Sequence, residues 1–366
     1  MSKMLKYPQK PQKIRIITKN DSNNLMMMKK NKVVCFGEML VRLPEAGADP
    51  NSLCLEQTKF GGSEANVAVS LAQLGDEVIY VTRLPDNKVG HTAVERLHAL
   101  GVDTSHVAYT GNKIGSYFLQ QGASRQKSVT VYDRDNTAFS TLKPGDLPWR
   151  ELLADAAVFH TSGISAAISQ SAADAMFEAI EIAQEMGVKV SVDINYRKNL
   201  WQYGAEPRST LIRLMQQADI MFGDAIEFEY ISDKRPVPFE ATSADFYMDL
   251  EAYSKWLNEF YALCPRCGKM IMGIRSQPAP THHVLTAILL DEGHMLHTRL
   301  NDITNVIDPV GVGDAFSAGS IHAALHFPDD GQKWLEYALS AATLKNQVPG
   351  DFNLSTDQQI LDFIKG

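Results

Sequence analysis

The sequence predicts an α/β protein in which helices cover both faces of a mostly parallel β-sheet and a small β-sheet forms a lid. Two observations predict this fold. Short apolar runs, typical of buried strands, alternate along most of the 366 residues with longer runs of helical periodicity, and such alternation is typical of parallel sheets. A hairpin-like segment interrupts the alternation once, and it predicts the lid.

The alternating elements can be placed in chain order. Strands are expected at 33–36, 78–82, 157–160, 188–193, 220–222 and 270–274. Helices are expected at 67–74, 93–100, 172–186, 315–326, 334–345 and 358–364. Gly75, Gly101 and Gly187 follow three of these helices, where a left-handed residue commonly ends a helix.

The lid is expected from two segments, 41–60 and 114–134. The second reads as strands 116–120 and 128–132 around a turn that contains Gly122. A hairpin inserted into an α/β sheet suits a cover over the edge where such sheets bind ligands. The alternative is a surface hairpin without function. Phe118, Val129 and Val131 give the hairpin an apolar face.

Composition limits the class of protein. The chain is 45% hydrophobic and 21% charged and carries a net charge of −8, which disfavours nucleic acid as a partner. No apolar run reaches membrane-spanning length and no signal peptide opens the chain, so a cytoplasmic location is expected. Residues 1–30 are polar and basic and are expected to be a disordered leader before one domain at 31–366. Cys264 and Cys267 form a lone C-x-x-C, interpreted as reduced thiols rather than half of a zinc or redox site.

The segment 308–316, Asp-Pro-Val-Gly-Val-Gly-Asp-Ala-Phe, carries the chemistry. Gly311, Val312 and Gly313 precede an apolar helical run expected to begin at Ala315, and free N–H groups at a helix start attract anions, most often phosphate. Asp314 in such a pocket suits a base that takes the proton from a hydroxyl attacking a phosphoryl group. The alternative is an Asp that only caps a structural helix. The spacing matches neither a dinucleotide fingerprint nor a P-loop.

Two arginines predict an acidic substrate. Thr130, Tyr132 and Arg134 share one face if their strand extends that far. Asn195 and Arg197 follow a buried strand, at the end where doubly wound sheets bind ligands. Arginine forks suit carboxylate or phosphate. The alternative for Arg134 is a solvated charge at a strand end.

The segment 308–316 resembles the D-T-V-G-A-G-D-A-F signature of the ribokinase-like (PfkB) sugar kinases, with Pro309 in place of Thr and Val312 in place of Ala. The resemblance extends from about Val33 to the C-terminus and looks closest to the 2-keto-3-deoxygluconate kinase subgroup. The segments that carry it are 61–66, 84–87, 101–106, 131–134, 193–197 with Leu200 and Trp201, and 348–353.

The resemblance implies ATP-dependent phosphorylation of the 6-hydroxyl of 2-keto-3-deoxygluconate. Asp314 would be the catalytic base, and the amides of Gly311, Val312 and Gly313 the anion hole. The sugar would be bound by Gly62, Asn66, Tyr117, Tyr132, Arg134 and Arg197, with Arg197 and Tyr132 on its carboxylate. The lid would cover the sugar and form the contact of a dimer.

The resemblance also implies a nucleotide site. Asp224-Ala-Ile-Glu227 stands where the family has N-x-x-E near magnesium and phosphate. The expected nucleotide contacts are Asn195, Asp224, Glu227, Arg275, Ala342 and Asn346. Glu227 is also the expected Mg²⁺ ligand, and activation by a monovalent cation such as K⁺ stays open. The segment 232–267 is longer and more charged than expected of the family, and no function is assigned to it.

Two alternatives stay open. One is a kinase of the same fold acting on a neutral sugar such as fructose, and the other is a non-catalytic sugar-binding regulator that kept the fold. The intact Gly311, Gly313 and Asp314 favour an enzyme. The sequence does not distinguish gluconate-derived from galactonate-derived acids, and it does not fix the oligomeric state.

Overall fold

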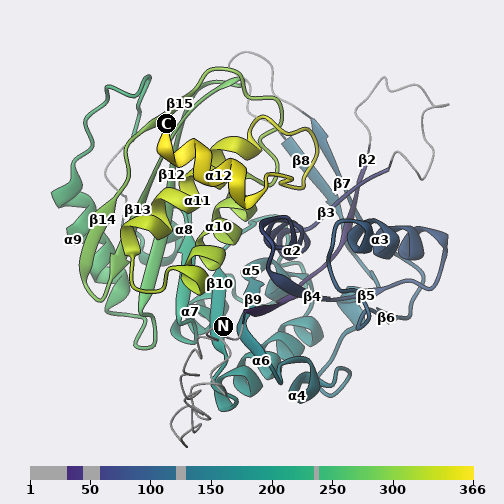
Figure 1. The fold of residues 1–366 in the computed structure, drawn as a ribbon. Coiled ribbons are helices and arrows are strands. Elements are labelled where there is room, and N and C mark those ends of the chain that lie inside the picture. The colour runs from purple at the N-terminus through teal and green to yellow at the C-terminus, as the bar shows by residue number, and fades with distance from the viewer. Residues whose placement is uncertain (1–30, 44–57, 121–128, 235–238) are drawn as a thin grey trace, which may run out of the picture. The chain divides into compact units, whose positions relative to one another are not determined.

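A nine-stranded sheet forms the centre of the fold (Figure 1). The structure is a computed structural model that describes residues 31–43, 58–120, 129–234 and 239–366. The expected leader 1–30, most of the expected lid segment 41–60 and the turn at Gly122 lie outside these ranges. The described residues belong to one compact unit, Asn31–Gly366.

The order of the main sheet is β14-β13-β12-β11-β10-β9-β1-β4, with β15 also paired to β13. The strands from β12 to β4 are parallel, as predicted, whereas β13, β14 and β15 are antiparallel. This antiparallel edge was not predicted, because a continuous apolar run such as that of β13 does not by itself distinguish a strand from a buried helix. The strands are β1 (Lys32–Phe36), β4 (Glu77–Val81), β9 (Ala156–Ser162), β10 (Lys189–Asp193), β11 (Ile220–Gly223), β12 (Lys269–Ala279), β13 (His282–Asp291), β14 (His294–His297) and β15 (Asn301–Ile303).

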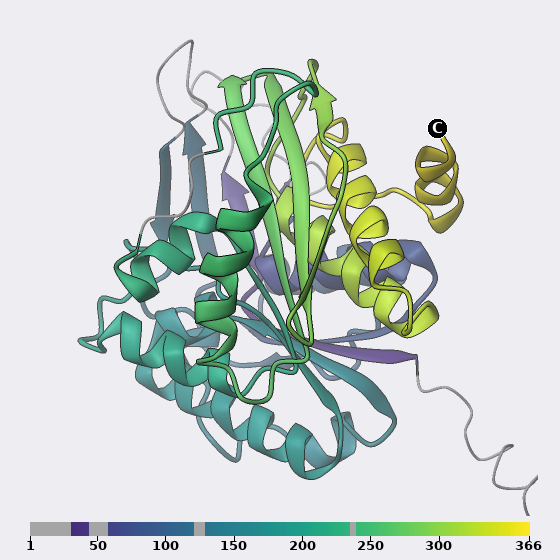
Figure 2. The same ribbon diagram turned by 90° about the vertical axis from the view of Figure 1, so that its left-hand side faces the viewer.

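Helices cover both faces of this sheet (Figure 2), which confirms the predicted architecture. Along β1, Val34 and Phe36 point into one core and Val33 and Cys35 into the other, as the two-residue period of a strand requires. The helices on the first side are α4 (Trp149–Leu152), α5 (Gly163–Ile168), α6 (Gln170–Glu185), α7 (Pro207–Gln216), α8 (Ala225–Ser232) and α9 (Leu250–Tyr261). Those on the second side are α2 (Ser63–Leu74), α3 (Lys88–Ala99), α10 (Val312–His326), α11 (Gly331–Lys345) and α12 (Asp357–Lys365).

Two smaller sheets complete the fold. The four-stranded sheet that corresponds to the predicted lid, and that keeps this name below, has the order β3-β2-β7-β8; the predicted hairpin is present and the first segment supplies the other two strands. Its strands are β3 (Lys59–Gly61), β2 (Leu40–Leu43), β7 (Gly115–Gln120) and β8 (Val129–Asp133). A two-stranded sheet pairs β5 (Arg83–Leu84) with β6 (Ala108–Tyr109), and a 3₁₀ turn spans Phe139–Thr141.

The segment 232–267, which had no assigned role, contributes to the core. Helix α9 buries Tyr253, Trp256, Leu257 and Phe260 on one side. Cys264 and Cys267 are buried free thiols, and burial raises the pKa of Cys264 to about 12 and that of Cys267 further. Such thiols are inert, in agreement with their interpretation as a reduced pair.

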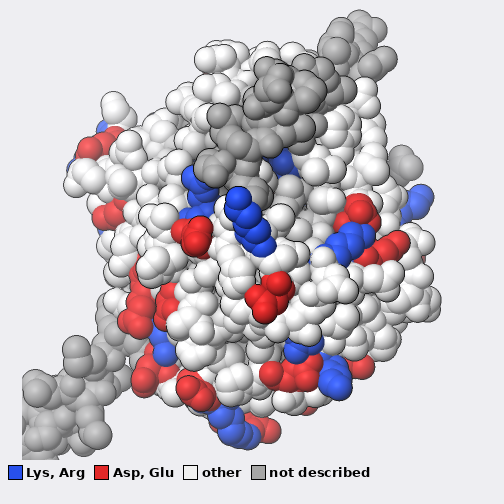
Figure 3. Space-filling model, turned by 90° about the vertical axis from the view of Figure 1, so that its right-hand side faces the viewer, with Lys and Arg blue, Asp and Glu red and all other residues white. Residues whose placement is uncertain are grey.

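Charges of both signs lie side by side on the face turned toward the viewer in Figure 3. No helix among the described residues is both long and apolar enough to cross a membrane.

Candidate active site

The glycine-rich segment forms the start of α10. The helix begins at Val312, three residues before the expected start at Ala315, so that expectation is wrong and Asp314 lies inside the first helical turn. The cause is Gly311, which caps the helix with a φ of 79°. A Cβ there would lie 2.0 Å from the carbonyl oxygen of Asp351, so no side chain fits. Gly313, in contrast, faces open space.

Asp314 lies on the second side of the sheet with its carboxylate held by two neighbours. Ser63 Oγ donates to Oδ1 at 2.7 Å, and Asn66 Nδ2 donates to Oδ2 at 2.7 Å. Burial raises the pKa of Asp314 to about 6, although these two hydrogen bonds oppose the shift. A carboxylate with a pKa near neutrality is a better base than an ordinary one, and it is still ionised at pH 7.

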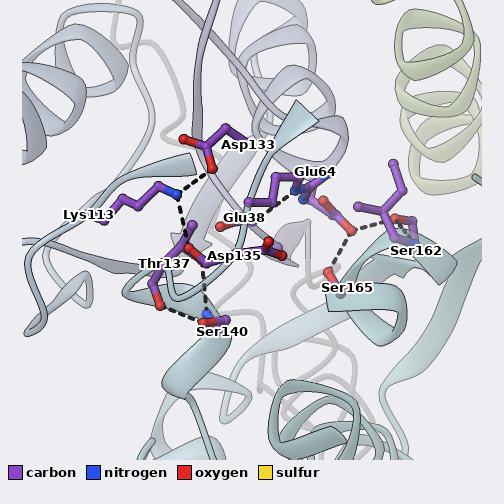
Figure 4. A network of polar contacts seen from close by, with 12 residues as sticks. Glu38, Glu64, Lys113, Asp133, Asp135, Thr137, Ser140, Ser162 and Ser165 are labelled. Carbon is purple, nitrogen blue, oxygen red and sulfur yellow. Dashed lines mark hydrogen bonds and ion pairs between the residues drawn. The ribbon is translucent and has the colours of Figure 1, made fainter. Parts of the chain in front are cut away.

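Ser63 and Asn66 come from the first turn of α2, which has its own fixed position. Gly62 caps this helix, and a Cβ on Gly62 would lie 2.3 Å from the carbonyl oxygen of Glu38. The next residue, Glu64, is fully buried and accepts hydrogen bonds from Ser162 Oγ at 2.6 Å and Ser165 Oγ at 2.9 Å (Figure 4). The carboxylate of Glu64 therefore fixes the start of α2 against β9 and α5, and with it the two residues that hold Asp314.

One cavity of about 640 Å³ brings most of the predicted site residues together. This volume lies within the usual range for small-molecule sites. The predicted residues that line the cavity are Gly62, Asn66, Tyr117, Tyr132, Arg134, Asn195, Arg197, Asp224, Glu227, Arg275, Gly311, Val312, Gly313, Asp314 and Ala342.

Arg134 reaches the cavity although β8 ends at Asp133, one residue earlier. It is buried rather than solvated, and its Nε donates to Glu38 Oε2 at 2.6 Å. Its Nη2 is buried and has no hydrogen-bond partner in the described part of the chain. An unpartnered guanidinium donor at a cavity wall suits an anionic ligand, because leaving it unpaired is costly.

Two other residues that line the cavity, Asn66 and Asn195, have buried side-chain oxygens without hydrogen-bond partners among the described residues. The other end of Asn195 donates to Ser63 Oγ at 2.9 Å. Asn195 has a φ of 42°, in the left-handed region that asparagine tolerates better than most residues. These oxygens can accept hydrogen bonds from ligand hydroxyls.

Arg197, Asp224 and Glu227 lie together at the start of α8. Asp224 and Glu227 form a capping box: Asp224 Oδ1 accepts from the Glu227 N–H at 2.9 Å, and Glu227 Oε2 accepts from the Asp224 N–H at 2.9 Å. Glu227 Oε1 lies 3.6 Å from Arg197 Nη1. Burial, then the nearby Asp224, raises the pKa of Glu227. Both carboxylates therefore cap the start of α8 and also line the cavity.

Of the remaining residues predicted to contact the nucleotide, two line the cavity and one does not. Ala342 and Arg275 line the cavity. Asn346 is fully buried and is not among the cavity-lining residues of the described chain. Its side chain donates to the Ala342 carbonyl at 2.8 Å and contacts His283 Nδ1 at 3.1 Å, and its carbonyl accepts from the Ile307 N–H at 2.8 Å. In the structure Asn346 therefore supports the chain just before the glycine loop.

Sequence reasoning missed an ionic network that joins the lid to the glycine loop. Arg42 of β2 donates from Nη1 to Asp308 Oδ2 at 2.8 Å and to Asp351 Oδ1 at 3.0 Å, and all three side chains are buried. The Tyr117 hydroxyl also donates to Asp351. Lys345 is fully buried and donates to the carbonyls of Asp308 at 3.3 Å and of Val348 at 2.9 Å. No local signal in the sequence pairs these residues, because they are up to 309 positions apart.

Asp193 is a second missed residue of the cavity. Burial, then the charge of Asp314, raises the pKa of Asp193 to about 7. Ser63 was missed as well, although it lies in the predicted segment 61–66. Its position between Gly62 and Asn66, both predicted to bind the sugar, could have indicated that the Ser63 hydroxyl belongs to the site.

A carboxylate in the first turn of a helix, an adjacent glycine that faces open space, and one cavity lined by arginines and carboxylates together suit phosphoryl transfer. Comparison with known proteins agrees. The model of the pfkB family carbohydrate kinases matches residues 30–252. The chain belongs to this family. It is a carbohydrate kinase with the ribokinase-like fold, so the non-catalytic regulator is set aside.

Relatives of this pfkB family member differ in their named substrates. A crystal structure of 2-dehydro-3-deoxygluconokinase from Thermotoga maritima is 32% identical with a TM-score of 0.80, covering 92% of this chain and 99% of that one. The 2-dehydro-3-deoxygalactonokinase of Haloferax volcanii is 26% identical over 92% of this chain and 97% of its own. Fructokinase-1 of Zea mays is 32% identical over 91% and 97%.

Proposed function

We propose that this kinase transfers the γ-phosphoryl group of ATP to the 6-hydroxyl of 2-keto-3-deoxygluconate. The observation that supports a sugar acid as the substrate is the buried, unpartnered Nη2 of Arg134, a residue that lines the same cavity as Asp314. A neutral sugar would leave this donor without a charged partner. The relatives named for 2-dehydro-3-deoxy acids support the same choice.

In this proposal Arg134, Arg197 and Tyr132 bind the carboxylate end of the sugar acid. Asn66 and Asn195 offer their free oxygens to its hydroxyls. The terminal hydroxyl then meets Asp314, which accepts its proton as the hydroxyl oxygen attacks phosphorus. The N–H groups at the start of α10 stabilise the charge on the transferred phosphoryl group.

The residues present also fit Mg²⁺. Glu227, Asp224 and Asp193 offer hard carboxylate oxygens around the cavity, and Mg²⁺ is commonly held by one or two carboxylates together with substrate phosphates. The ion would neutralise phosphate charge during transfer. Arg275 and Ala342 would contact the nucleotide. Lys345 is a buried cation beneath the glycine loop. Kinetic assays with and without K⁺ test activation by a monovalent cation.

The test compares kinetics on 2-keto-3-deoxygluconate, its galactonate-derived epimer and fructose. Arg134→Lys keeps a positive charge beside Glu38 while removing the fork, and Arg197→Ala removes a side chain that is 43% exposed, so both variants should fold. Hydrogen bonds to charged groups are worth ~1.5–3 kcal/mol, so KM for the acid should rise by about 10- to 150-fold and KM for fructose little. The exposed Arg150→Ala is the matched control.

The contrary outcome is that the wild type phosphorylates fructose with a kcat/KM equal to or greater than that for the sugar acids, and that neither variant acts selectively on the acids. That result would show that the substrate is a neutral sugar. The two keto-deoxy acids in the panel assign the stereochemistry.

The proposal includes a homodimer through the outer face of the lid. Leu43, Val129 and Val131 are 43%, 53% and 59% exposed, and Phe118 pairs with both Leu43 and Val131 in the sheet. An exposed apolar sheet face of this kind suits a second copy of the chain. A function that consumes ATP also agrees with the expected cytoplasmic location.

A further inference from the structure

A cluster of two histidines and one aspartate lies outside the cavity, at the far ends of the two helices that carry Asp314 and Asn66. Asp76 follows α2, and His322 and His326 lie one turn apart near the end of α10. The three ligand atoms, one from each side chain, all lie within 4.8 Å of one another. Within the described residues this is the one group of three or more His, Cys, Asp or Glu side chains that meets this spacing.

The two ring nitrogens converge on one carboxylate. His322 Nδ1 lies 2.8 Å from Asp76 Oδ2, and His326 Nε2 lies 2.8 Å from Asp76 Oδ1. The rings themselves are tilted with centroids 4.2 Å apart. Other histidine–aspartate pairs of the chain, such as His91 with Asp86, involve a single histidine.

The burial of Asp76 requires compensation for its charge. Its side chain is 0% exposed, and in the described part of the chain its ion pairs are with the two histidines and not with Lys or Arg. Buried charges in proteins are paired or coordinate metal ions. Neutral imidazoles donate hydrogen bonds but no charge, whereas a dication bound by the same three groups would offset the charge of Asp76 and that of the neighbouring Asp357 carboxylate.

The second layer of contacts also has the arrangement of a metal site. The other nitrogen of His322, Nε2, lies 3.6 Å from Asp357 Oδ1. Asp357 is held in turn by the Tyr337 hydroxyl, and the Tyr337 ring stacks on His322. Metal-bound histidines characteristically direct their second nitrogen at a carboxylate, which fixes the tautomer and the ring. His326 is 35% exposed and leaves one side open to solvent.

We propose that Asp76, His322 and His326 bind a first-row transition-metal dication of the Zn²⁺ class, with water as the fourth ligand. Imidazole nitrogen with one carboxylate oxygen is a ligand set that Zn²⁺ favours. Bonds of ~2.0–2.1 Å in a tetrahedron place ligand atoms about 3.3 Å apart. The 2.8 Å contacts would open by about 0.5 Å, and the widest separation among the three ligand atoms, which is at most 4.8 Å, would close toward the same value.

A bound ion would join the ends of α2 and α10. Those helices carry Ser63 and Asn66, and Asp314, at their opposite ends. The ion would thus stabilise the arrangement of α2 and α10, the two helices that position the proposed catalytic base Asp314, without entering the cavity. Its role is structural or regulatory, and it is independent of the Mg²⁺ that accompanies the nucleotide.

The experiment titrates Zn²⁺ into metal-free full-length protein, without nucleotide and with any histidine tag removed, by calorimetry. Co²⁺ in place of Zn²⁺ reports coordination through its visible absorption. The wild type is expected to bind one Zn²⁺ per chain and to melt at a higher temperature with it. Asp76→Asn and His326→Gln should weaken binding by more than about 100-fold. Asp357→Asn, which acts through His322, should weaken it by about 10- to 100-fold.

His91→Ala is the matched control, because it removes a histidine beside an aspartate without touching the cluster. It should bind Zn²⁺ as the wild type does. Circular dichroism of the metal-free variants checks that each is folded. No saturable Zn²⁺ binding by the wild type, or equal affinity in the wild type, Asp76→Asn and His326→Gln, would overturn the site.

Discussion

Replacing Asp314 with asparagine should make the kinase more stable and, at the same time, inactive. The carboxylate is held in a buried environment that raises its pKa from 3.8 to about 6. A raised pKa means that ionisation destabilises the fold. The stability contributed by the protonated form is complete below the unfolded pKa of 3.8 and is lost as the pH rises through about 6.

The size of this effect follows from the shift. About 2.2 pH units at 1.36 kcal/mol each is an upper limit of ~3 kcal/mol at neutral pH. Asp314 is partly accessible from the cavity, and the hydrogen bonds from Ser63 and Asn66 are remade imperfectly to an amide. We therefore expect Asp314→Asn to raise the free energy of unfolding by about 1–2 kcal/mol at neutral pH and by little near pH 4.

Turnover should fall in the same variant by about 10²- to 10⁴-fold, the usual contribution of a general base. In the wild type, kcat/KM should fall about tenfold per pH unit below about 6, as the base becomes protonated. The assays are urea denaturation at both pH values and a coupled ADP assay across pH. Asp362→Asn, an exposed carboxylate on α12, is the control for both.

A variant that is less stable than the wild type at neutral pH, or that keeps near-normal turnover, would refute the reasoning. The first result would mean that the carboxylate is well solvated or favourably paired. The second would mean that Asp314 does not accept the proton.

Three further predictions concern the glycine loop, the buried ion network and the outer face of the lid. Gly313→Ala adds a methyl group in open space, so this variant should fold normally but have a lower kcat, because the methyl group obstructs phosphate binding at the start of α10. Gly311→Ala should instead yield little soluble protein, because its Cβ would meet the Asp351 carbonyl oxygen. Equal activity of Gly313→Ala and the wild type would contradict phosphate binding there. Arg42→Met leaves two buried carboxylates without their cation and should lower the free energy of unfolding, measured by urea titration, by about 3–5 kcal/mol. The double variant Arg42→Met, Asp351→Asn should recover part of this free energy. No recovery would argue against the loss of the ion pair as the cause. Val131→Glu should convert the dimer to a monomer in light scattering, with an unchanged mass ruling out this face as the contact.

The parallel α/β core, the hairpin of the small sheet and most of the residues that line the cavity could be predicted from the amino-acid sequence. Strand and helix periods report which side chains are buried, and a glycine-rich turn before a helix has one strong chemical use, so local pattern sufficed for Gly311, Gly313 and Asp314. The pairs Tyr132 with Arg134 and Asn195 with Arg197 were also visible locally, because strand ends in such sheets meet at one edge.

Which of these groups are already engaged by other side chains could be seen only once the chain was folded. The pairing of Arg134 with Glu38 and that of Asn346 with His283 depend on residues far away in the chain. The same holds for Arg42 with Asp308 and Asp351, and for Asp76 with His322 and His326, which lie 246 or more positions apart. Periodicity records burial along one element, whereas charge pairing and metal coordination arise where separate elements meet.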